Sequence, residues 1–230
     1  MTDEKIQAAK AHWSGRMVSN GMPLADFQDV TTQTQRWDDW CIALSNRGDI
    51  HADLGSESEE GGFLLSAGEH YVTAAICYHF GKFLFVNNPI QMKSTHKKAV
   101  DIYTKALPYL NPPGERVSIP YNGGTLYGNL RAPNGIKTPP VVILIMGLDS
   151  AKEEMFYNEQ LFLDRGMATL TFDGPGQGEA EYDLSICPEY EKPVQAVIEF
   201  TKTRKDLDAS SIGLWGVSMG GYYAARAAAF

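Results

Sequence analysis

Apolar residues recur at helical spacing through the first 110 residues of the chain. The repeat is clearest over residues 71–78 and 100–110, where aromatic and aliphatic side chains return every three or four positions. That period places them on one face of a helix. Residues 78–85, Tyr-His-Phe-Gly-Lys-Phe-Leu-Phe, are apolar almost all round, which predicts a helical segment buried on two sides. The acidic, Gly/Ser-rich residues 55–62 predict a solvated loop instead.

The pattern changes near residue 112. Residues 111–114, Asn-Pro-Pro-Gly, end the last helix and join two regions of different character. We therefore expect an all-helical N-terminal domain over residues 1–111 and an α/β domain over residues 112–230.

Short β-branched runs alternate with helical patterns in the second domain. Residues 115–121 and 125–131 flank an Asn-Gly-Gly turn and predict a hairpin. The continuous apolar run at residues 141–145 is typical of a central parallel strand covered on both faces. The remaining elements follow in alternating order: a helix that begins with a capping box at residues 150–153, a strand at 167–172, a helix at 190–203, a strand at 212–216 and a helix over 220–230. This alternation predicts an α/β fold with a mostly parallel sheet.

Composition narrows the classes of function. The 230-residue chain has 20 basic and 28 acidic residues, a formal net charge of −8, which argues against a nucleic-acid-binding surface and favours a small-molecule partner. No secretory signal opens the sequence, and the longest apolar run, residues 141–146, is too short to cross a membrane. Cys41, Cys77 and Cys187 fit neither a zinc spacing nor a disulfide framework. We expect a cytoplasmic protein with buried, reduced thiols, no metal and no cofactor.

The sharpest chemical signal is Gly-Val-Ser-Met-Gly at residues 216–220, between a predicted strand and a small-residue helix. Such a nucleophile elbow exposes a serine hydroxyl at the carboxyl edge of a sheet and tolerates only tiny side chains at its flanks. The helix directs free N–H groups toward a developing oxyanion. Ser218 is thus the candidate nucleophile. The backbone N–H groups of Met219 and of Leu148, in the turn after residues 141–146, are the candidate oxyanion donors.

Residues 173–179, Asp-Gly-Pro-Gly-Gln-Gly-Glu, follow another predicted strand. They lack both the lysine and the glycine spacing of phosphate-binding loops, which disfavours a nucleotide site. We expect a rigid loop at the carboxyl edge of the sheet, beside the active site.

Chain order places no general base for Ser218. In the serine α/β-hydrolases the order is Ser, then an acid, then His. Here all five histidines precede Ser218, only twelve residues follow it, and the chain ends within an alanine-rich helical pattern. We expect a C-terminally truncated hydrolase core that lacks turnover by itself, because a serine without its base is disarmed.

Five motifs form a specific combination that spans nearly the whole chain: RWDDWC at residues 36–41, YHFGKFLF at 78–85, GLDSAKEE at 147–154, FDGPGQGE at 172–179 and GVSMGGYYA at 216–224. The combination resembles the 2,6-dihydroxypseudooxynicotine hydrolase family of α/β-hydrolases, which is similar to fungal polyketide-shortening hydrolases.

The resemblance implies a helical N-terminal domain that forms part of a substrate pocket over an α/β-hydrolase core, commonly in a homodimer. It places the nucleophile on Ser218 and the oxyanion donors on Met219 and Leu148. It implies cleavage of a C–C bond beside a ketone, in an acyl-arene or β-dicarbonyl substrate, through an acyl-enzyme. His79, on the aromatic helix, is a candidate substrate-binding residue; its alternative is a core histidine.

Two other functions stay open. A carboxylesterase or thioesterase would use the same serine. A non-catalytic, hydrolase-like regulatory or binding protein, similar to the fermentation–respiration switch proteins, would not need the triad. An acid and a histidine in the expected order after Ser218 would distinguish an enzyme from the last of these.

Overall fold

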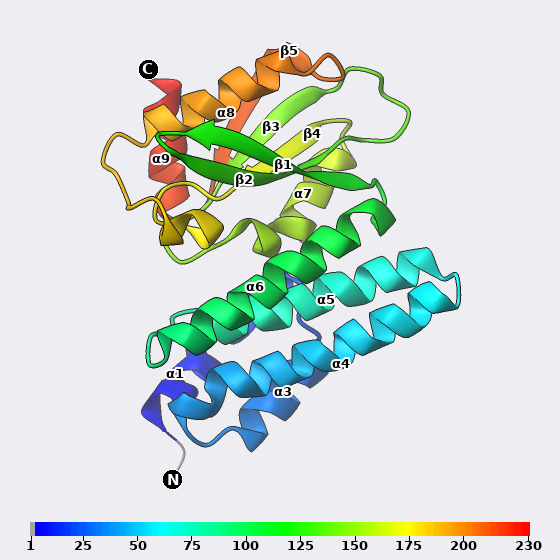
Figure 1. The fold of residues 1–230 in the computed structure, drawn as a ribbon, viewed down its shortest axis with the longest axis vertical. Coiled ribbons are helices and arrows are strands. Elements are labelled where there is room, and N and C mark those ends of the chain that lie inside the picture. The colour runs from blue at the N-terminus through cyan, green and yellow to red at the C-terminus, as the bar shows by residue number, and fades with distance from the viewer. Residues whose placement is uncertain (1–2) are drawn as a thin grey trace. The chain divides into compact units, whose positions relative to one another are not determined.

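The computed structural model describes residues 3–230 (Figure 1). The chain divides into two compact units, Met1–Asn111 and Pro112–Phe230, which we call the helical unit and the sheet unit. None of the helices in the described residues combines the length and apolarity that a membrane crossing requires.

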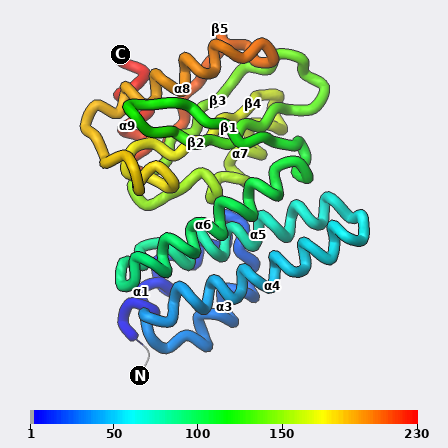
Figure 2. Tube along the Cα trace, in the orientation of Figure 1, coloured from blue at the N-terminus to red at the C-terminus, as the bar shows by residue number. Residues whose placement is uncertain are grey.

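The helical unit is built on three long helices that run side by side, as the ribbon and the trace both show (Figures 1 and 2). These are α4 (Trp40–Glu60), α5 (Leu64–Lys82) and α6 (Pro89–Ala106). The middle helix, α5, contacts both neighbours and is buried along most of its length, as predicted for its aromatic end. The shorter helices are α1 (Glu4–His12), α2 (Ser14–Ser19), α3 (Leu24–Gln33) and the 3₁₀ turns η1 (Trp37–Asp39) and η2 (Leu107–Tyr109).

The predicted loop at residues 55–62 is wrong, because α4 continues through it to Glu60. Its glycines serve helix packing rather than a turn. A Cβ added to Gly48 would lie 2.5 Å from the ring of Tyr78, and one added to Gly55 would lie 2.4 Å from the ring of Tyr71. The two glycines are seven residues apart, two helical turns, so both face α5. They open notches that admit two tyrosine rings.

An aromatic cluster fills the other end of this unit. The rings of Trp37 and Trp40 stack at 5.2 Å, and Trp13 packs edge-on against Phe83 at 5.1 Å. The Trp40 indole N–H donates to the Phe80 carbonyl at 2.9 Å. The three tryptophans pack within the core of the helical unit.

The sheet unit contains five strands in the order β1-β2-β4-β3-β5. Strand β3 runs parallel to β4 and β5, whereas the hairpin β1–β2 joins β4 in antiparallel fashion, so the sheet is mixed. The predicted order of a helical region followed by an α/β core is confirmed. The strands are β1 (Gly114–Tyr121), β2 (Gly124–Arg131), β3 (Pro140–Ile145), β4 (Ala168–Phe172) and β5 (Asp208–Gly216).

Helices cover both faces of this sheet. Along β3, Val141, Ile143 and Ile145 belong to a core shared with α8 (Glu191–Thr203) and α9 (Met219–Ala228). The alternate residues Val142 and Leu144 belong to a second cluster with Met155 and Phe162, on the side of α7 (Phe156–Leu163). Burial of both faces explains why β3 reads as a continuous apolar run.

The predicted capping box at residues 150–153 is wrong. The Ser150 hydroxyl donates to Glu154 Oε2 at 2.6 Å, whereas the Glu153 carboxylate binds the Lys152 ammonium at 2.6 Å. Residues 152–155 form a 3₁₀ turn, η3 (Lys152–Met155), and α7 starts only at Phe156. The reason is a buried ion cluster that holds Lys152 and Glu153 in place.

Strand β5 lies at an edge of the sheet and pairs only with β3 within residues 3–230. A groove runs beside it, lined chiefly by apolar side chains, including Ile198, Ile212, Leu214, Trp215, Ala224 and Ala228.

Candidate active site

Ser218 occupies the turn between β5 and α9. Its backbone has φ 56° and ψ −126°, a conformation that L residues rarely adopt. The residue is exposed to solvent. Strain of this kind persists only where the surrounding structure imposes it, and it concentrates at functional sites.

The flanking glycines are required by close backbone approach. A Cβ on Gly216 would lie 2.0 Å from the Gly220 carbonyl oxygen, and a Cβ on Gly220 would lie 2.1 Å from the Ile145 carbonyl oxygen. Neither neighbour is a flexible side chain. The elbow therefore packs directly against the end of β3, and the Val217 N–H donates to the Ile145 carbonyl at 3.3 Å.

The turn after β3 lies against the serine. A Cβ on Gly147 would stand 3.0 Å from Ser218 Cβ and 3.4 Å from Ser218 Oγ. Leu148, the next residue, is half exposed. Met219 is the first residue of α9, so its N–H has no acceptor within the helix. The structure thus places Gly147 against Ser218, and the next residue, Met219, has an N–H without a helical acceptor. An N–H of that kind is suited to stabilising an anion formed at the serine.

Gln177 connects this turn to the loop that follows β4. Its side chain is buried, and its amide nitrogen donates to the carbonyl oxygens of Met146 and Gly147, each at 2.7 Å. Its amide oxygen accepts from the Gly174 N–H at 3.0 Å and from the Tyr190 hydroxyl. The loop at residues 173–179 is therefore bound to the end of β3, beside Ser218, as its predicted position required.

Tyr190 carries the connection on to α9. Its ring stacks on that of Tyr223, with centroids 3.7 Å apart and planes 7° apart. Burial raises the pKa of the Tyr190 hydroxyl well above its usual value, so it stays a protonated donor to Gln177. One chain of contacts thus joins the Gly147 turn, the 173–179 loop and the helix that begins at the elbow.

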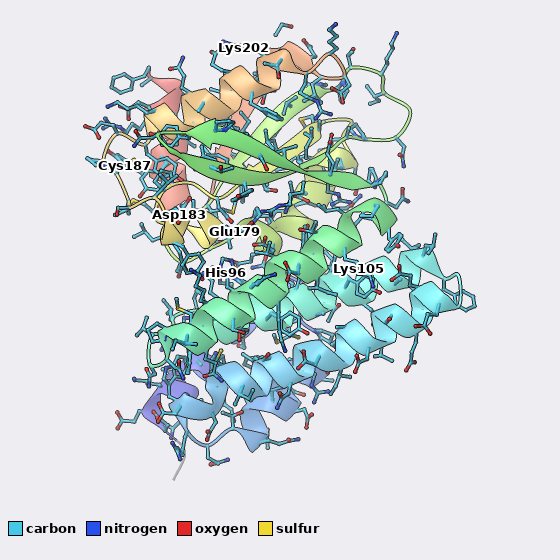
Figure 3. The ribbon with its side chains drawn as sticks, viewed as in Figure 1. His96, Lys105, Glu179, Asp183, Cys187 and Lys202 are labelled. Carbon is cyan, nitrogen blue, oxygen red and sulfur yellow. The ribbon has the colours of Figure 1, made fainter. Side chains whose placement is uncertain are left out.

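A buried ion cluster also holds these two loops together. Lys152 Nζ lies 2.8 Å from Asp173, 2.6 Å from Glu153 and 2.6 Å from Glu179. Glu179 lies on the 3₁₀ turn η4 (Gly178–Tyr182) and is labelled in Figure 3. Arg116 of β1 donates to both oxygens of Glu179, at 2.6 and 2.8 Å. Two cations thus face three carboxylates.

The carboxylates respond differently to burial. Burial alone would raise the pKa of Asp173, but the Lys152 ammonium and N–H donors from Lys152 and Glu179 outweigh it and lower that pKa. Burial prevails at Glu153, whose pKa is raised despite Lys152. The pKa of Lys152 is raised because the attraction of its carboxylate neighbours, Asp173 first, exceeds the cost of burying the ammonium.

This cluster is also the one group of metal-ligand type found between residues 3 and 230. Oxygens of Glu153, Asp173 and Glu179 lie within 4.8 Å of one another. The Lys152 ammonium binds all three. The lysine thus supplies internally the positive charge that a metal ion would bring, and the residues do not fit a metal site.

A shallow groove opens beside the elbow. It is lined by Ile186, Cys187, Pro188, Met219, Tyr222 and Tyr223, with the charged Glu189 and Arg226 alongside. Cys187 is only half-buried, unlike the fully buried Cys41 and Cys77, and all three thiols are free. The expectation of three buried thiols is therefore wrong at Cys187.

The histidines all belong to the helical unit. His79 is fully buried in α5, where its ring packs edge-on against Phe80 at 5.0 Å. Ser218 and Met219 are adjacent in the elbow, and Leu148 follows Gly147, which packs against Ser218. Their catalytic roles stay predictions. The sequence interpretation missed Gln177, Lys152 and Tyr190 as members of the site. Gln177 lies in the motif at residues 173–179, which was predicted to lie at this edge of the sheet. The sequence does not show which groups its side chain binds.

Comparison with known proteins agrees with this geometry. The chain is 37% identical over 221 residues to the 2,6-dihydropseudooxynicotine hydrolase of Paenarthrobacter nicotinovorans, covering 94% of this chain and 58% of that protein. It is 32% identical over 210 residues to the hydrolyase poxO of Penicillium oxalicum, covering 83% and 49%. The crystal structure of the 2,6-dihydroxy-pseudo-oxynicotine hydrolase superposes with a TM-score of 0.85 at 35% identity, over 95% of this chain and 61% of that one.

These matches confirm the resemblance expected from the motifs. The chain spans between about half and three-fifths of the length of these relatives. Residues 23–230 also match the family described as Esterase FrsA-like. Because that match covers most of the chain, including the elbow and the turn that packs against it, the protein belongs to the FrsA-like esterase family.

Proposed function

We propose that this protein is a serine-dependent hydrolase that cleaves a carbon–carbon bond beside a ketone, with Ser218 as the nucleophile. The observation that carries the proposal is the position of Ser218: exposed, at positive φ, at the start of α9 and against Gly147. The 37% identity to a 2,6-dihydropseudooxynicotine hydrolase supports the substrate class, an acyl-arene or β-dicarbonyl compound.

The proposed chemistry proceeds through an acyl-enzyme. Ser218 Oγ adds to the ketone carbon as its proton passes to a base, and the resulting oxyanion accepts hydrogen bonds from the N–H groups of Met219 and Leu148. When the carbonyl re-forms, the carbon–carbon bond breaks and its electron pair leaves with the aryl or enolate carbon. That carbon takes the proton from the base. Water then hydrolyses the serine ester, which releases a carboxylic acid and restores the hydroxyl.

We place the triad acid and histidine outside residues 1–230, in the full-length protein. The order of the fold puts both after the nucleophile, and no histidine follows Ser218 within these residues. The 230-residue polypeptide should accordingly show no turnover, while the full-length protein should.

By the same resemblance, we propose a small aromatic or polyketide-like substrate, a homodimer and a substrate contact from His79. The groove of Tyr222, Tyr223 and Ile186 beside Met219 supports an aromatic ligand, because flat apolar side chains pack well against aryl rings.

The contact from His79 can be tested by substitution. His79→Gln should raise KM more than it lowers kcat if the ring contacts substrate. A purely structural histidine would instead lower the melting temperature and leave KM unchanged.

A second candidate is a carboxylesterase or thioesterase, which the family description as an esterase favours. The full-length protein should be assayed on an aryl ketone and on a p-nitrophenyl ester, with Ser218→Ala as the matched control. Ketone cleavage that is lost in Ser218→Ala supports the first function. Fast ester turnover without ketone cleavage establishes the second, and unchanged activity in Ser218→Ala removes Ser218 from the mechanism.

A further inference from the structure

Gln177 uses the whole hydrogen-bonding capacity of its side chain. A glutamine amide has two N–H donors and two acceptor lone pairs. Here both donors bind carbonyl oxygens, of Met146 and Gly147, and the oxygen accepts from the Gly174 N–H and the Tyr190 hydroxyl. The opposite amide orientation would set the glutamine oxygen against two carbonyl oxygens. Its orientation is therefore fixed by its partners.

One of those partners belongs to the peptide unit that carries the Leu148 N–H. The Gly147 carbonyl and the Leu148 N–H are two ends of a single planar, trans peptide, so they point in opposite directions. Holding the Gly147 oxygen at 2.7 Å from Gln177 thus directs the Leu148 N–H away from Gln177.

Neither side chain that flanks this peptide fixes it in place. Residue 147 is glycine because a Cβ there would stand 3.0 Å from that of Ser218, and glycine leaves the neighbouring backbone free to rotate. The Leu148 side chain is 48% exposed and gives the turn little packing. A buried amide with two donors supplies the missing restraint.

We propose that Gln177 is a positioning residue that holds the Gly147–Leu148 peptide with its N–H available to the oxyanion. The inference rests on the proposed function, since it assigns that N–H to an anion formed at Ser218. Gln177 does not touch the substrate. It acts through the peptide, and its effect is confined to the stage at which negative charge develops.

Two variants of the full-length enzyme test the role, with Gln195→Met, at an exposed position of α8, as the matched control. Gln177→Met removes all four hydrogen bonds, and Gln177→Glu keeps the acceptors but replaces both donors. Loss of one oxyanion-hole donor typically lowers kcat by about 100- to 1,000-fold, so a loosened donor should lower it by about 10- to 100-fold with KM nearly unchanged. Gln195→Met makes the same change of side chain but keeps all four hydrogen bonds of Gln177, and it should leave kcat unchanged.

Two readouts separate positioning from a general structural role. The affinity for a trifluoromethyl ketone, which forms an oxyanion on the serine, should fall in parallel with kcat/KM across the variants, while KM stays constant. In Gln177→Glu, kcat should recover relative to wild type as the pH falls, because a protonated carboxyl regains one donor. Gln177→Met cannot show that recovery.

The outcomes also separate this inference from the function on which it rests. If Ser218→Ala abolishes turnover but folded Gln177 variants keep wild-type kcat, the positioning role is overturned and the nucleophile stands. If Ser218→Ala is fully active, both are overturned. If Gln177→Met does not fold, Gln177→Glu alone tests the positioning role. A reduced kcat in Gln177→Glu that does not recover as the pH falls would contradict the role.

Discussion

Ser218 combines an exposed hydroxyl with a backbone that L residues avoid, at φ 56° and ψ −126°. Residues held in such regions cost on the order of 1–3 kcal/mol, and glycine would escape most of that cost. Ser218→Gly should therefore raise the free energy of unfolding by about 1 kcal/mol. Ser218→Ala, which keeps the Cβ, should leave it unchanged, and both should be inactive. Urea unfolding midpoints check the difference, and a Ser218→Gly protein less stable than Ser218→Ala would contradict it.

Glu59 is a second residue whose environment makes a testable prediction. Its carboxylate accepts from Lys105, Tyr71 and Tyr109 at 2.6–2.8 Å, and these bonds lower its pKa to about 2. Lys105 is labelled on α6 in Figure 3. Because the folded-state pKa lies below the unfolded value, the stabilisation is fully present above the unfolded pKa and is lost as the pH falls toward 2.

The measurement is the stability of wild type and Glu59→Gln as a function of pH. The wild type should be the more stable protein at pH 6, and the gap should close between about pH 4 and pH 2. A gap that stays constant over that range would show that the glutamate acts through its shape and not through its charge.

Among the elements, the 3₁₀ turn η3 depends on one lysine. Lys152→Met would leave Glu153 and Asp173 buried without their common cation, and removing one partner of a buried ion network typically costs about 3–5 kcal/mol. The loss should be smaller at pH 4 than at pH 7, because burial without the ammonium raises the pKa of both carboxyls and a protonated carboxyl needs no cation. Lys202→Met is the control, because Lys202 pairs with Glu199 on the exposed surface (Figure 3) and should change stability little. Thermal melts of both variants at pH 7 and pH 4 check this prediction.

The contact between α4 and α5 depends on its glycine notches. Gly55→Ala would place a methyl group 2.4 Å from the Tyr71 ring and should destabilise the protein by about 1–3 kcal/mol through overpacking. Gly15→Ala is the matched control, since nothing lies within 4 Å of a Cβ on that helical glycine. It should be neutral or stabilising by up to about 1 kcal/mol, because alanine is the better helix former. Equal melting temperatures for the two variants would contradict the prediction that the Tyr71 ring leaves no room for a side chain at residue 55.

At the scale of the whole molecule, the hydrophobic pattern predicted those helices and strands whose conformation local sequence determines. The strand at 141–145, the hairpin and the elbow follow from local pattern and turn chemistry. Residues 55–60 were wrongly predicted as a loop, because their helix packs against tyrosines of α5. Those tyrosines lie too far away in sequence to affect a local pattern. Gln177 and Lys152 were missed for the same reason. The Met146 carbonyl that Gln177 binds and the Asp173 carboxylate that Lys152 binds lie 31 and 21 residues away in sequence, and they meet only when β3 and β4 pair.

The open edge of β5 has a consequence for weighing the molecule in solution. Unpaired N–H and C=O groups beside a groove of Ile212, Leu214 and Trp215 form a template for strand addition by another copy. Two such polypeptides joined edge to edge would form a dimer that need not use the interface of the proposed homodimer. Light scattering on these 230 residues alone would therefore not distinguish edge-to-edge pairing through β5 from the proposed homodimer. The native oligomeric state should be measured on the full-length protein. A dimer is native when the measured mass is twice that of one full-length chain and does not increase with protein concentration.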